Sequence, residues 1–453
     1  MKKILIFETA LFTPHTETGL EIFFSNKSQG NCTKYVPLYN ILTNIETHLF
    51  CDNKFHKDRC EYITPKIKSL IGSNDFIEPN IENIDAKIPV FSADPAIFKL
   101  YIEQFPIGPY LYNNITQYIK NSEVNLKHKE TFELARELYS IGVQSYYYSK
   151  RIIEQTKPDI IYVCNGRFMS QAGTVWAARA TDTTYYIHER GPDLNNFFLN
   201  KYLHDHEGVH DDLRNINANV DQEILSHVAN QFYTGIREGA EKSWPSFIGN
   251  QKGGELPAKI KNRSFMSYFQ SSDFESGTFP GNNMDRGLGR QKKAFQKLKS
   301  LCEKLNKFLV VRMHPNQANG SVEDFNFWKN QQSENTLVIE PTDPTDTYEL
   351  MDKSEIVTTF SSSVGIEAAY NYKPVIVLGR CYYETCDEIM KPRSEEELES
   401  FLCNPSKPRK RKGAEIFGYY TMMNSIPHYY YKPIATFDGT IKGVTLFDQF
   451  KMN

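Results

Sequence analysis

Two segments in the last third of the chain each carry an apolar strand into a polar loop. They are FLVVRMHPN, residues 308–316, and EIVTTFSSSVGIEAAYNYKPVIVLG, residues 355–379. The loops offer side chains that can hydrogen-bond a phosphate: Arg312, His314, Asn316, Ser361, Ser362 and Ser363. In open α/β sheets, ligands collect at the carboxyl ends of the strands, and a helix that begins after such serines presents free N–H groups to an anion. The pair of segments therefore predicts a phosphate-binding floor for a nucleotide.

The residue types suggest separate roles in such a floor. His314 is expected to hydrogen-bond or protonate a leaving phosphate, and Arg312 either assists it or forms a structural ion pair. Glu367 lies one turn into the helix after the serines and is expected to accept hydrogen bonds from ribose hydroxyls. Ser271 and Ser272 follow the first strand of the second domain and are expected to approach the donor from the hinge. A structural reading stays open for each, because serines also cap helices.

The first half of the chain carries a second group of polar residues after apolar strands. His15, Glu17 and Glu189 are candidate catalytic residues, because a carboxylate beside an imidazole can act as a general base. The candidate contacts to an acceptor or an anionic sugar are Asn165, Arg167, His188 and Arg190. An arginine suits carboxylate recognition because its fork is bidentate. The alternatives are a helix cap at residues 15–17 and a buried ion pair at residues 188–190.

Strands and helices alternate along most of the chain, which predicts parallel sheets with helices on both faces. The expected fold is α/β, with two tandem Rossmann-like domains and a deep cleft between them. The linker is expected in QKGGELPAKIKN, residues 251–262, where Gly, Pro and Lys cluster. The predicted units are a first domain at 1–250 with a helical insertion around 60–156, a second domain at 260–415, and a tail at 416–453 that packs back on the first domain.

Composition narrows the functional classes. The net charge of -3 and pI of about 6.4 argue against a nucleic-acid binder. The eight cysteines include no CxxC pair, and no long apolar run occurs, so reduced thiols and a cytoplasmic location are expected. The spacing of Cys51, His56 and Cys60 fits no standard zinc site. Asp343 to Asp346 is better read as a helix cap than as a metal motif, so neither a metal nor a cofactor is expected.

The HP dipeptide after a strand, followed by the serine-rich loop and the GIEA helix start, resembles bacterial capsule-polysaccharide biosynthesis glycosyltransferases. These include enzymes that transfer Kdo from its CMP donor, and bacterial sialyltransferases share the HP and serine motifs. TPHTETGLEI (13–22), VCNGRF (163–168) and HERGP (188–192) also resemble segments of this group. The resemblance implies the two-domain GT-B arrangement and a metal-independent transfer. Residues 60–125 and the C-terminal tail carry no recognised motif.

The resemblance favours transfer of a sugar from a nucleotide-activated donor, with CMP-Kdo preferred, to a growing capsule or lipopolysaccharide glycan. Two other enzyme classes stay open: a CDP-polyol phosphotransferase and a UDP-sugar 2-epimerase, although SSSVGIEAA carries one acid where an epimerase is expected to have a glycine-rich loop and paired acids. A non-catalytic nucleotide- or glycan-binding partner of a polysaccharide assembly complex is the alternative of another class. The basic run at residues 407–412 is either a solvated loop or a contact to the inner face of the cytoplasmic membrane, where a lipid-linked acceptor would lie.

Overall fold

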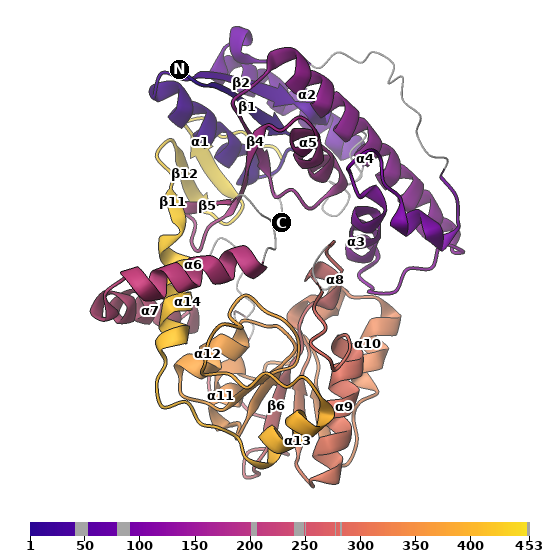
Figure 1. The fold of residues 1–453 in the computed structure, drawn as a ribbon, viewed down its shortest axis with the longest axis vertical. Coiled ribbons are helices and arrows are strands. Elements are labelled where there is room, and N and C mark those ends of the chain that lie inside the picture. The colour runs from indigo at the N-terminus through magenta and orange to yellow at the C-terminus, as the bar shows by residue number, and fades with distance from the viewer. Residues whose placement is uncertain are drawn as a thin grey trace.

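The computed structural model forms two lobes stacked along the long axis of the molecule (Figure 1). It describes residues 1–40, 53–78, 91–200, 206–239, 249, 251–276, 278–280 and 283–450, with the side chains of 53–56 and 275–276 left out. Cys51 and the side chain of His56 lie outside the described residues, and so does part of the predicted insertion. Among the described residues, no helix combines the length and the apolar character that a membrane crossing needs.

The first lobe is built on a six-stranded sheet in the order β11-β5-β4-β3-β1-β2. Strands β1 to β4 are parallel neighbours, and β5 and β11 add antiparallel pairs at one edge. The elements of this lobe are β1 (Lys3–Glu8), α1 (His15–Ser28), β2 (Cys32–Pro37), α2 (Asn53–Ile71), α3 (Ile107–Ile119), α4 (Lys129–Thr156), β3 (Ile160–Cys164), α5 (Met169–Ala180), β4 (Thr184–Arg190) and β5 (Asn196–Asn200).

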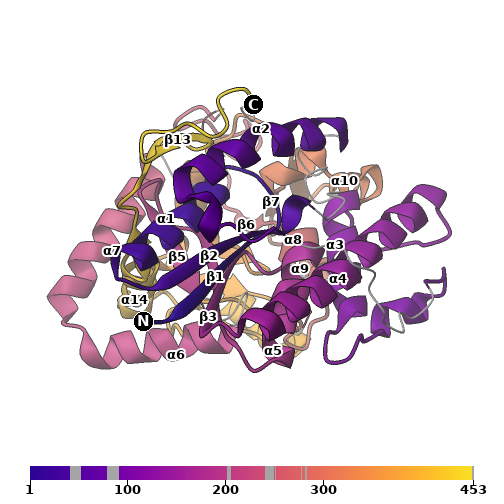
Figure 2. The same ribbon diagram turned by 90° about the horizontal axis from the view of Figure 1, so that it is seen from above.

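Both faces of this sheet are covered, which explains why the middle of β1, Ile4 to Phe7, is apolar. Ile4 and Ile6 pack with α1, α2 and the C-terminal hairpin on one face. Leu5 and Phe7, which alternate with them, pack with α3, α4 and α5 on the other. Figures 1 and 2 show α1 and α5 on opposite sides of the strands. Burial on both faces fixes the register of β1 and therefore the position of the loop that follows it.

The second lobe holds a five-stranded parallel sheet in the order β10-β9-β6-β7-β8. One face packs on α7 (Gln222–Arg237), α11 and α12, and the other on α9, α10 and α13. The elements are β6 (Met266–Phe269), α8 (Asp273–Ser276), α9 (Gln291–Lys304), β7 (Leu309–Arg312), α10 (Val322–Lys329), β8 (Thr336–Ile339), α11 (Thr347–Lys353), β9 (Val357–Thr359), α12 (Val364–Tyr370), β10 (Val375–Val377) and α13 (Glu395–Cys403). The chain is therefore α/β, with two Rossmann-like domains in tandem.

Two segments cross between the lobes. Helices α6 (His206–Asn219) and α7 (Gln222–Arg237) precede the expected linker, yet α7 packs on the second lobe, where the ring of Tyr233 stacks on Tyr370 at 4.0 Å. The chain therefore begins to pack on the second lobe before residues 251–262, where composition placed the linker. Helix α14 (Lys412–Met423) packs on α6 and α7, and the chain then returns to the first lobe as β11 (Ser425–Pro427), β12 (Tyr431–Ala435) and β13 (Asp438–Ile441).

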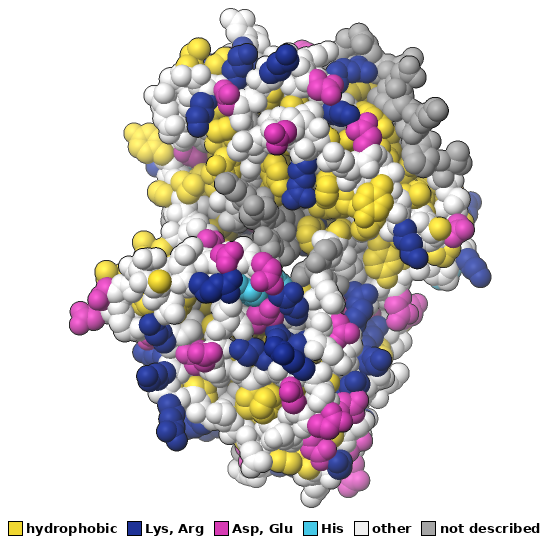
Figure 3. All heavy atoms as spheres, viewed as in Figure 1, with side chains coloured by type: hydrophobic (Ala, Val, Ile, Leu, Met, Phe, Trp, Pro, Cys, Tyr) yellow, Lys and Arg dark blue, Asp and Glu magenta, His cyan; other side chains and the backbone are white. Residues whose placement is uncertain are grey.

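Figure 3 shows the molecule hollowed at its waist, between the two lobes. On one side of this waist, helix α3 of the first lobe contacts the second lobe. From α3, the Nδ2 of Asn114 donates to the carbonyl oxygen of Arg167 in the loop after β3. One residue earlier, the Nδ2 of Asn113 donates to the hydroxyl of Thr278, in the segment that follows β6, at 2.8 Å. The carboxyl ends of the two sheets therefore face the same interdomain region.

Candidate functional site

The second sheet has its topological switch point between β6 and β9. From β6 the chain moves to β7 and β8 on one side, and then returns to β9 and β10 on the other. The loops after β6 and β9 consequently diverge at their shared edge, which is where open α/β sheets bind ligands. Ser271 and Ser361, one from each loop, are joined there, because the backbone N–H of Ser361 donates to the hydroxyl of Ser271 at 3.0 Å. The structure thus brings together the serine groups that lie 90 residues apart in sequence.

His314 lies beside this switch point and is held in one orientation. Its Nδ1 accepts a hydrogen bond from the backbone N–H of Asn316 at 3.1 Å, at the start of the short 3₁₀ helix Pro315–Asn319. Burial, together with the nearby Arg312, lowers the pKa of His314 to about 4. The imidazole is therefore neutral at pH 7, and because Nδ1 accepts, its proton is on Nε2. His314 can donate one neutral hydrogen bond to a phosphate oxygen.

Two polar groups at the switch point are buried with no hydrogen-bond partner among the residues that the structure describes. They are the Nε2 of Gln270, a side chain 2% exposed, and the hydroxyl of Ser272, in a residue 8% exposed. The Oε1 of Gln270 accepts from the backbone N–H of His314 at 2.9 Å, so this residue links the loop after β6 to the loop after β7. An unsatisfied buried donor costs about 1–3 kcal/mol. A ligand oxygen at this position would remove that penalty.

Ser362 and Ser363, in the loop after β9, already make hydrogen bonds within the protein. Ser362 accepts a long hydrogen bond from the N–H of Val364 at 3.4 Å, and its own N–H donates to Thr359. Ser363 occupies the N-cap position without capping, and its hydroxyl donates to Glu367 at 3.2 Å. Helix α12 has only 7 residues, so its dipole is a weak basis for an anion site. The case for a phosphate floor rests on the convergence of three loops.

Arg312 and Glu367 already have structural partners. The guanidinium of Arg312 donates to the carbonyl oxygens of Glu340 at 2.7 Å and Asp343 at 3.1 Å, which ties β7 to the loop after β8. The carboxylate of Glu367 accepts from the hydroxyl of Tyr348 at 3.1 Å as well as from Ser363. The hydrogen bonds of Arg312 and Glu367 are therefore those of residues that hold the fold together. Asp346 likewise accepts from the N–H groups of Tyr348 and Glu349, as expected of a helix cap.

The first sheet has its switch point between β1 and β3, because the chain places β2 on one side of β1 and β3, β4 and β5 on the other. His15 is the first residue of α1. Its Nδ1 lies 3.1 Å from the Sγ of Cys164, the last residue of β3. Its Nε2 accepts from the Nε of Arg190 at 3.3 Å. Burial lowers the pKa of His15 well below its usual value, so the ring is neutral.

Residues 188–190 lie inside β4, where they pair with β5, and not in the loop beyond a shorter strand. The strand extends because β5 follows as an antiparallel partner. Glu189 joins His15, Cys164 and Arg190 in one polar cluster. Its Oε1 lies 3.4 Å from the Nε2 of His15, and its Oε2 accepts from the side-chain amide of Asn165. At 21% exposure, the side chain of Glu189 is more accessible than that of His15, at 3%. Arg167 is half-buried with its guanidinium 5.0 Å from the ring centre of Phe168.

Two buried carboxyl groups complete the cluster. Burial raises the pKa of Glu17 to about 8, and one of its oxygens, Oε2, has no hydrogen-bond partner among the described residues. Burial, reinforced by Glu17, also raises the pKa of Glu8 to about 8. Glu8 ends β1 and accepts from the hydroxyl of Tyr35 at 3.4 Å. At neutral pH both groups therefore hold protons beside the switch point.

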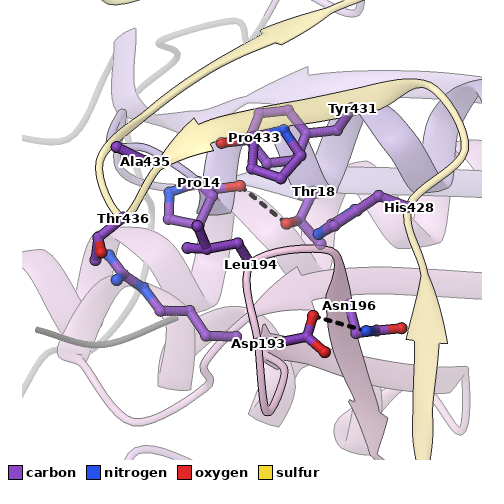
Figure 4. Close-up of a pocket in the computed structure, with 11 residues that line it drawn as sticks. Pro14, Thr18, Asp193, Leu194, Asn196, His428, Tyr431, Pro433, Ala435 and Thr436 are labelled. Atoms are coloured by element: carbon purple, nitrogen blue, oxygen red, sulfur yellow. Dashed lines mark hydrogen bonds between the residues drawn. The ribbon is translucent and has the colours of Figure 1, made fainter. Parts of the chain in front are cut away.

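Figure 4 shows a small pocket at the edge of this cluster, between the start of α1 and the C-terminal hairpin. Arg190 reaches its wall, and the Nδ2 of Asn196 donates to Asp193 at 2.7 Å on its floor. Tyr431 and His428 close it from the C-terminal segment. The tail of the chain, which the motifs did not explain, therefore forms part of the surroundings of Arg190.

The motif analysis missed Glu8, Cys164, Gln270 and the two C-terminal rings at positions 428 and 431. A signal existed for the first three, because Glu8 and Gln270 are the first polar residues at the ends of β1 and β6, and Cys164 ends β3 within the quoted VCNGRF segment. No local signal identified His428 and Tyr431. Their position follows from pairing of β11 with β5 and from hydrogen bonds of the N–H groups of Tyr430 and Tyr431 to Glu21.

Comparison with known proteins agrees with the resemblance. Residues 289–409 match the family model of capsule polysaccharide biosynthesis proteins, and this segment contains the HP and serine loops. No curated protein sequence matches the chain significantly.

Among solved structures, one similar chain is the KpsC beta Kdo 2,4 transferase of Thermosulfurimonas dismutans, at 14% identity and TM-score 0.38 over 58% of this chain and 79% of that one. A second is the UDP-GlcNAc 2-epimerase of Neisseria meningitidis, at 13% identity and TM-score 0.32 over 93% and 100%. A third is the MurG protein of Acinetobacter baumannii, at 10% identity and TM-score 0.28 over 96% and 97%. Scores this low carry no argument about activity.

Proposed function

From the match of residues 289–409 to capsule polysaccharide biosynthesis proteins and from the geometry of the two switch points, we propose that the chain is a glycosyltransferase. It moves a sugar from a nucleotide-activated donor, with CMP-Kdo favoured, to a growing capsule or lipopolysaccharide glycan. The observation that carries the proposal is the convergence of His314, Gln270 and Ser272 beside the β6–β9 switch point. Two buried groups there have no hydrogen-bond partner among the described residues.

The donor's phosphate is the group to be stabilised, because glycosyl transfer leaves negative charge on it. His314 donates from Nε2, and the amide of Gln270 and hydroxyl of Ser272 add two neutral donors. Neutral donors in a buried site stabilise developing charge without the desolvation of a buried cation. The donor set would act on the phosphate without a metal, so we expect added Mg²⁺ to leave the affinity for the nucleotide unchanged.

The acceptor enters from the first domain. Glu189 is the carboxylate of that cluster with measurable exposure, at 21%, and Asn165 and the N–H of Arg190 hold its two oxygens. It would take the proton of the acceptor hydroxyl as that oxygen attacks the anomeric carbon. His15 and Glu17 would support it from the buried side. Arg167, with its half-buried guanidinium, would contact the carboxylate of an acidic donor sugar such as Kdo.

Calorimetric titration with CMP, CDP, UDP and GDP tests the donor site. We expect one nucleotide to bind the wild type, and His314→Ala to weaken it by about 10- to 150-fold, because a hydrogen bond to a charged group contributes about 1.5–3 kcal/mol. His314→Asn is the matched control for the cap: its side-chain oxygen can still accept from the N–H of Asn316 but does not reach as far.

CMP binding would support a Kdo-type donor, CDP would favour a phosphotransferase, and UDP or GDP would redirect the donor to hexoses. Loss of CMP release from CMP-Kdo in Glu189→Gln, with nucleotide affinity intact, would support the acceptor role. If no nucleotide binds a folded sample, or if His314→Ala binds as tightly as wild type, the transferase proposal fails and a non-catalytic partner becomes the better reading.

A further inference from the structure

Three potential metal ligands meet inside the first lobe. They are His15 at the start of α1, Cys164 at the end of β3 and His188 in β4, and their ligand atoms all lie within 4.8 Å of one another. Cys164 and His188 are direct neighbours in the register of β3 and β4. Each therefore stands on a regular element held by its own backbone hydrogen bonds. Preorganised ligands of this kind need little movement to close on an ion.

The three side chains are almost completely excluded from water, at 3% exposure for His15, 1% for Cys164 and 1% for His188. The Nδ1 of His188 has no hydrogen-bond partner among the residues that the structure describes. Burial also lowers the pKa of His188 to about 3, so this ring keeps its lone pair at neutral pH. A buried ring nitrogen without a partner destabilises the fold by about 1–3 kcal/mol unless something binds it.

We propose that His15, Cys164 and His188 bind a single zinc ion at the switch point of the first sheet. One thiolate and two imidazoles form a mixed set of nitrogen and sulfur ligands, which suits Zn²⁺ better than Mg²⁺ or Ca²⁺. Three protein ligands leave one tetrahedral position for water. The ion would join the loop after β1 to the ends of β3 and β4. The site shares His15 and Glu189 with the proposed acceptor side of the transferase, but all its groups lie outside the donor loops.

The surroundings provide the hydrogen bonds that such a site needs. Without metal, Arg190 donates to the Nε2 of His15, so the His15 proton is on Nδ1 and faces Cys164. With a metal on Nδ1, the ring proton would lie on Nε2, so Arg190 would give up its hydrogen bond to Nε2. Nε2–H would then donate to Glu189 Oε1, which lies 3.4 Å from Nε2 in this structure. A carboxylate behind a ligand histidine is the usual second partner in zinc sites. The thiol of Cys164 loses its proton to solvent, so one proton is released for each ion bound.

The charge in the neighbourhood is also compatible with a cation. Arg190 opposes a second positive charge, but it keeps its hydrogen bond to the carbonyl oxygen of Thr13 and lies near Glu17. Glu189 places a carboxylate 3.4 Å from His15, while Glu8 and Glu17 hold protons at neutral pH and add no positive charge. A different acidic group, Glu207, His210 and Glu384, is a weaker candidate, because Arg380 bonds both of its carboxylates and Arg286 also pairs with Glu384.

The test is a titration of the metal-free full chain with Co²⁺ under reducing conditions, followed by competition with Zn²⁺. We expect one Co²⁺ per chain, a thiolate-to-cobalt charge-transfer band, and loss of that band when Zn²⁺ is added. Elemental analysis of the protein before chelation should find zinc near one equivalent. Cys164→Ala and His188→Ala should abolish the band.

Cys302→Ala is the matched control, because Cys302 is another buried free cysteine, located on α9 in the second lobe. It should keep the band. Absence of the band in folded wild type, or its survival in Cys164→Ala, overturns the proposal, and the first of these outcomes needs no variant to fold. Nucleotide titrations on the same samples report the donor site separately, so failure of the zinc site and failure of the proposed function are distinguishable.

Discussion

The buried carboxyl of Glu17 should make the first domain less stable as pH rises, and Glu17→Gln should remove that loss. The side chain is 1% exposed, and burial raises its pKa from 4.5 to about 8. Between these two values the folded chain holds a proton that the unfolded chain has released. The unfolded state therefore binds fewer protons in this window, and the free energy of unfolding falls with increasing pH. Glutamine keeps the shape of the protonated acid and does not titrate.

The size of the effect follows from the two pKa values. One pKa unit corresponds to about 1.4 kcal/mol, so between about pH 5.5 and about pH 7.5 the wild type should lose about 2.5 kcal/mol relative to the variant. The loss is smaller than the full window allows, because the carboxyl of the folded state begins to ionise as the pH approaches its pKa of about 8. In hydrogen exchange, this difference equals about 70-fold in the protection of amides that exchange by unfolding of the domain.

The measurement is hydrogen exchange by mass spectrometry on peptides that cover β1, at both pH values, corrected for the intrinsic exchange rate. β1 is an interior strand of the first sheet and is buried on both faces, so its amides report on that domain and not on the second. Glu21→Gln is a matched control on the same helix, whose carboxylate accepts from the N–H groups of Tyr430 and Tyr431. It should lower protection at both pH values. An equal change in protection with pH for wild type and Glu17→Gln would refute the reasoning.

Two further predictions concern stability and the surface. Gly108→Ala should destabilise the chain by several kcal/mol, roughly the cost of a forced backbone shift. The reason is that a Cβ at this position would lie 2.4 Å from the carbonyl oxygen of Ile97. Thermal unfolding measures the loss of stability. The double variant Lys407→Glu and Lys410→Glu should reduce sedimentation of the protein with vesicles that contain anionic lipid, because both side chains are exposed. Arg411 pairs with Glu415 and should matter less. Equal sedimentation of wild type and variant would show that the basic run is a solvated loop.

The sequence determined the class of fold, because its signals are local. Alternation of Ile4 and Ile6 with Leu5 and Phe7 gives a strand with two buried faces, and such strands separated by helices require parallel sheets. The polar residues after β7 and β9 were found for the same reason, since each lies directly after its own strand. Helix caps such as Asp346 are equally local, and the structure agrees with that expectation.

Tertiary structure decided which polar residues share a site and which are already engaged. Only strand order brings Ser271 beside Ser361, and only packing shows that Arg312 is bound to the carbonyls of the loop after β8. Pairing of β11 with β5 carries His428 to the first lobe, across more than 200 residues of sequence, which no local pattern encodes. The His15–Cys164–His188 cluster depends on the same long-range order, and burial, which neutralises these imidazoles, is a property of the folded chain alone.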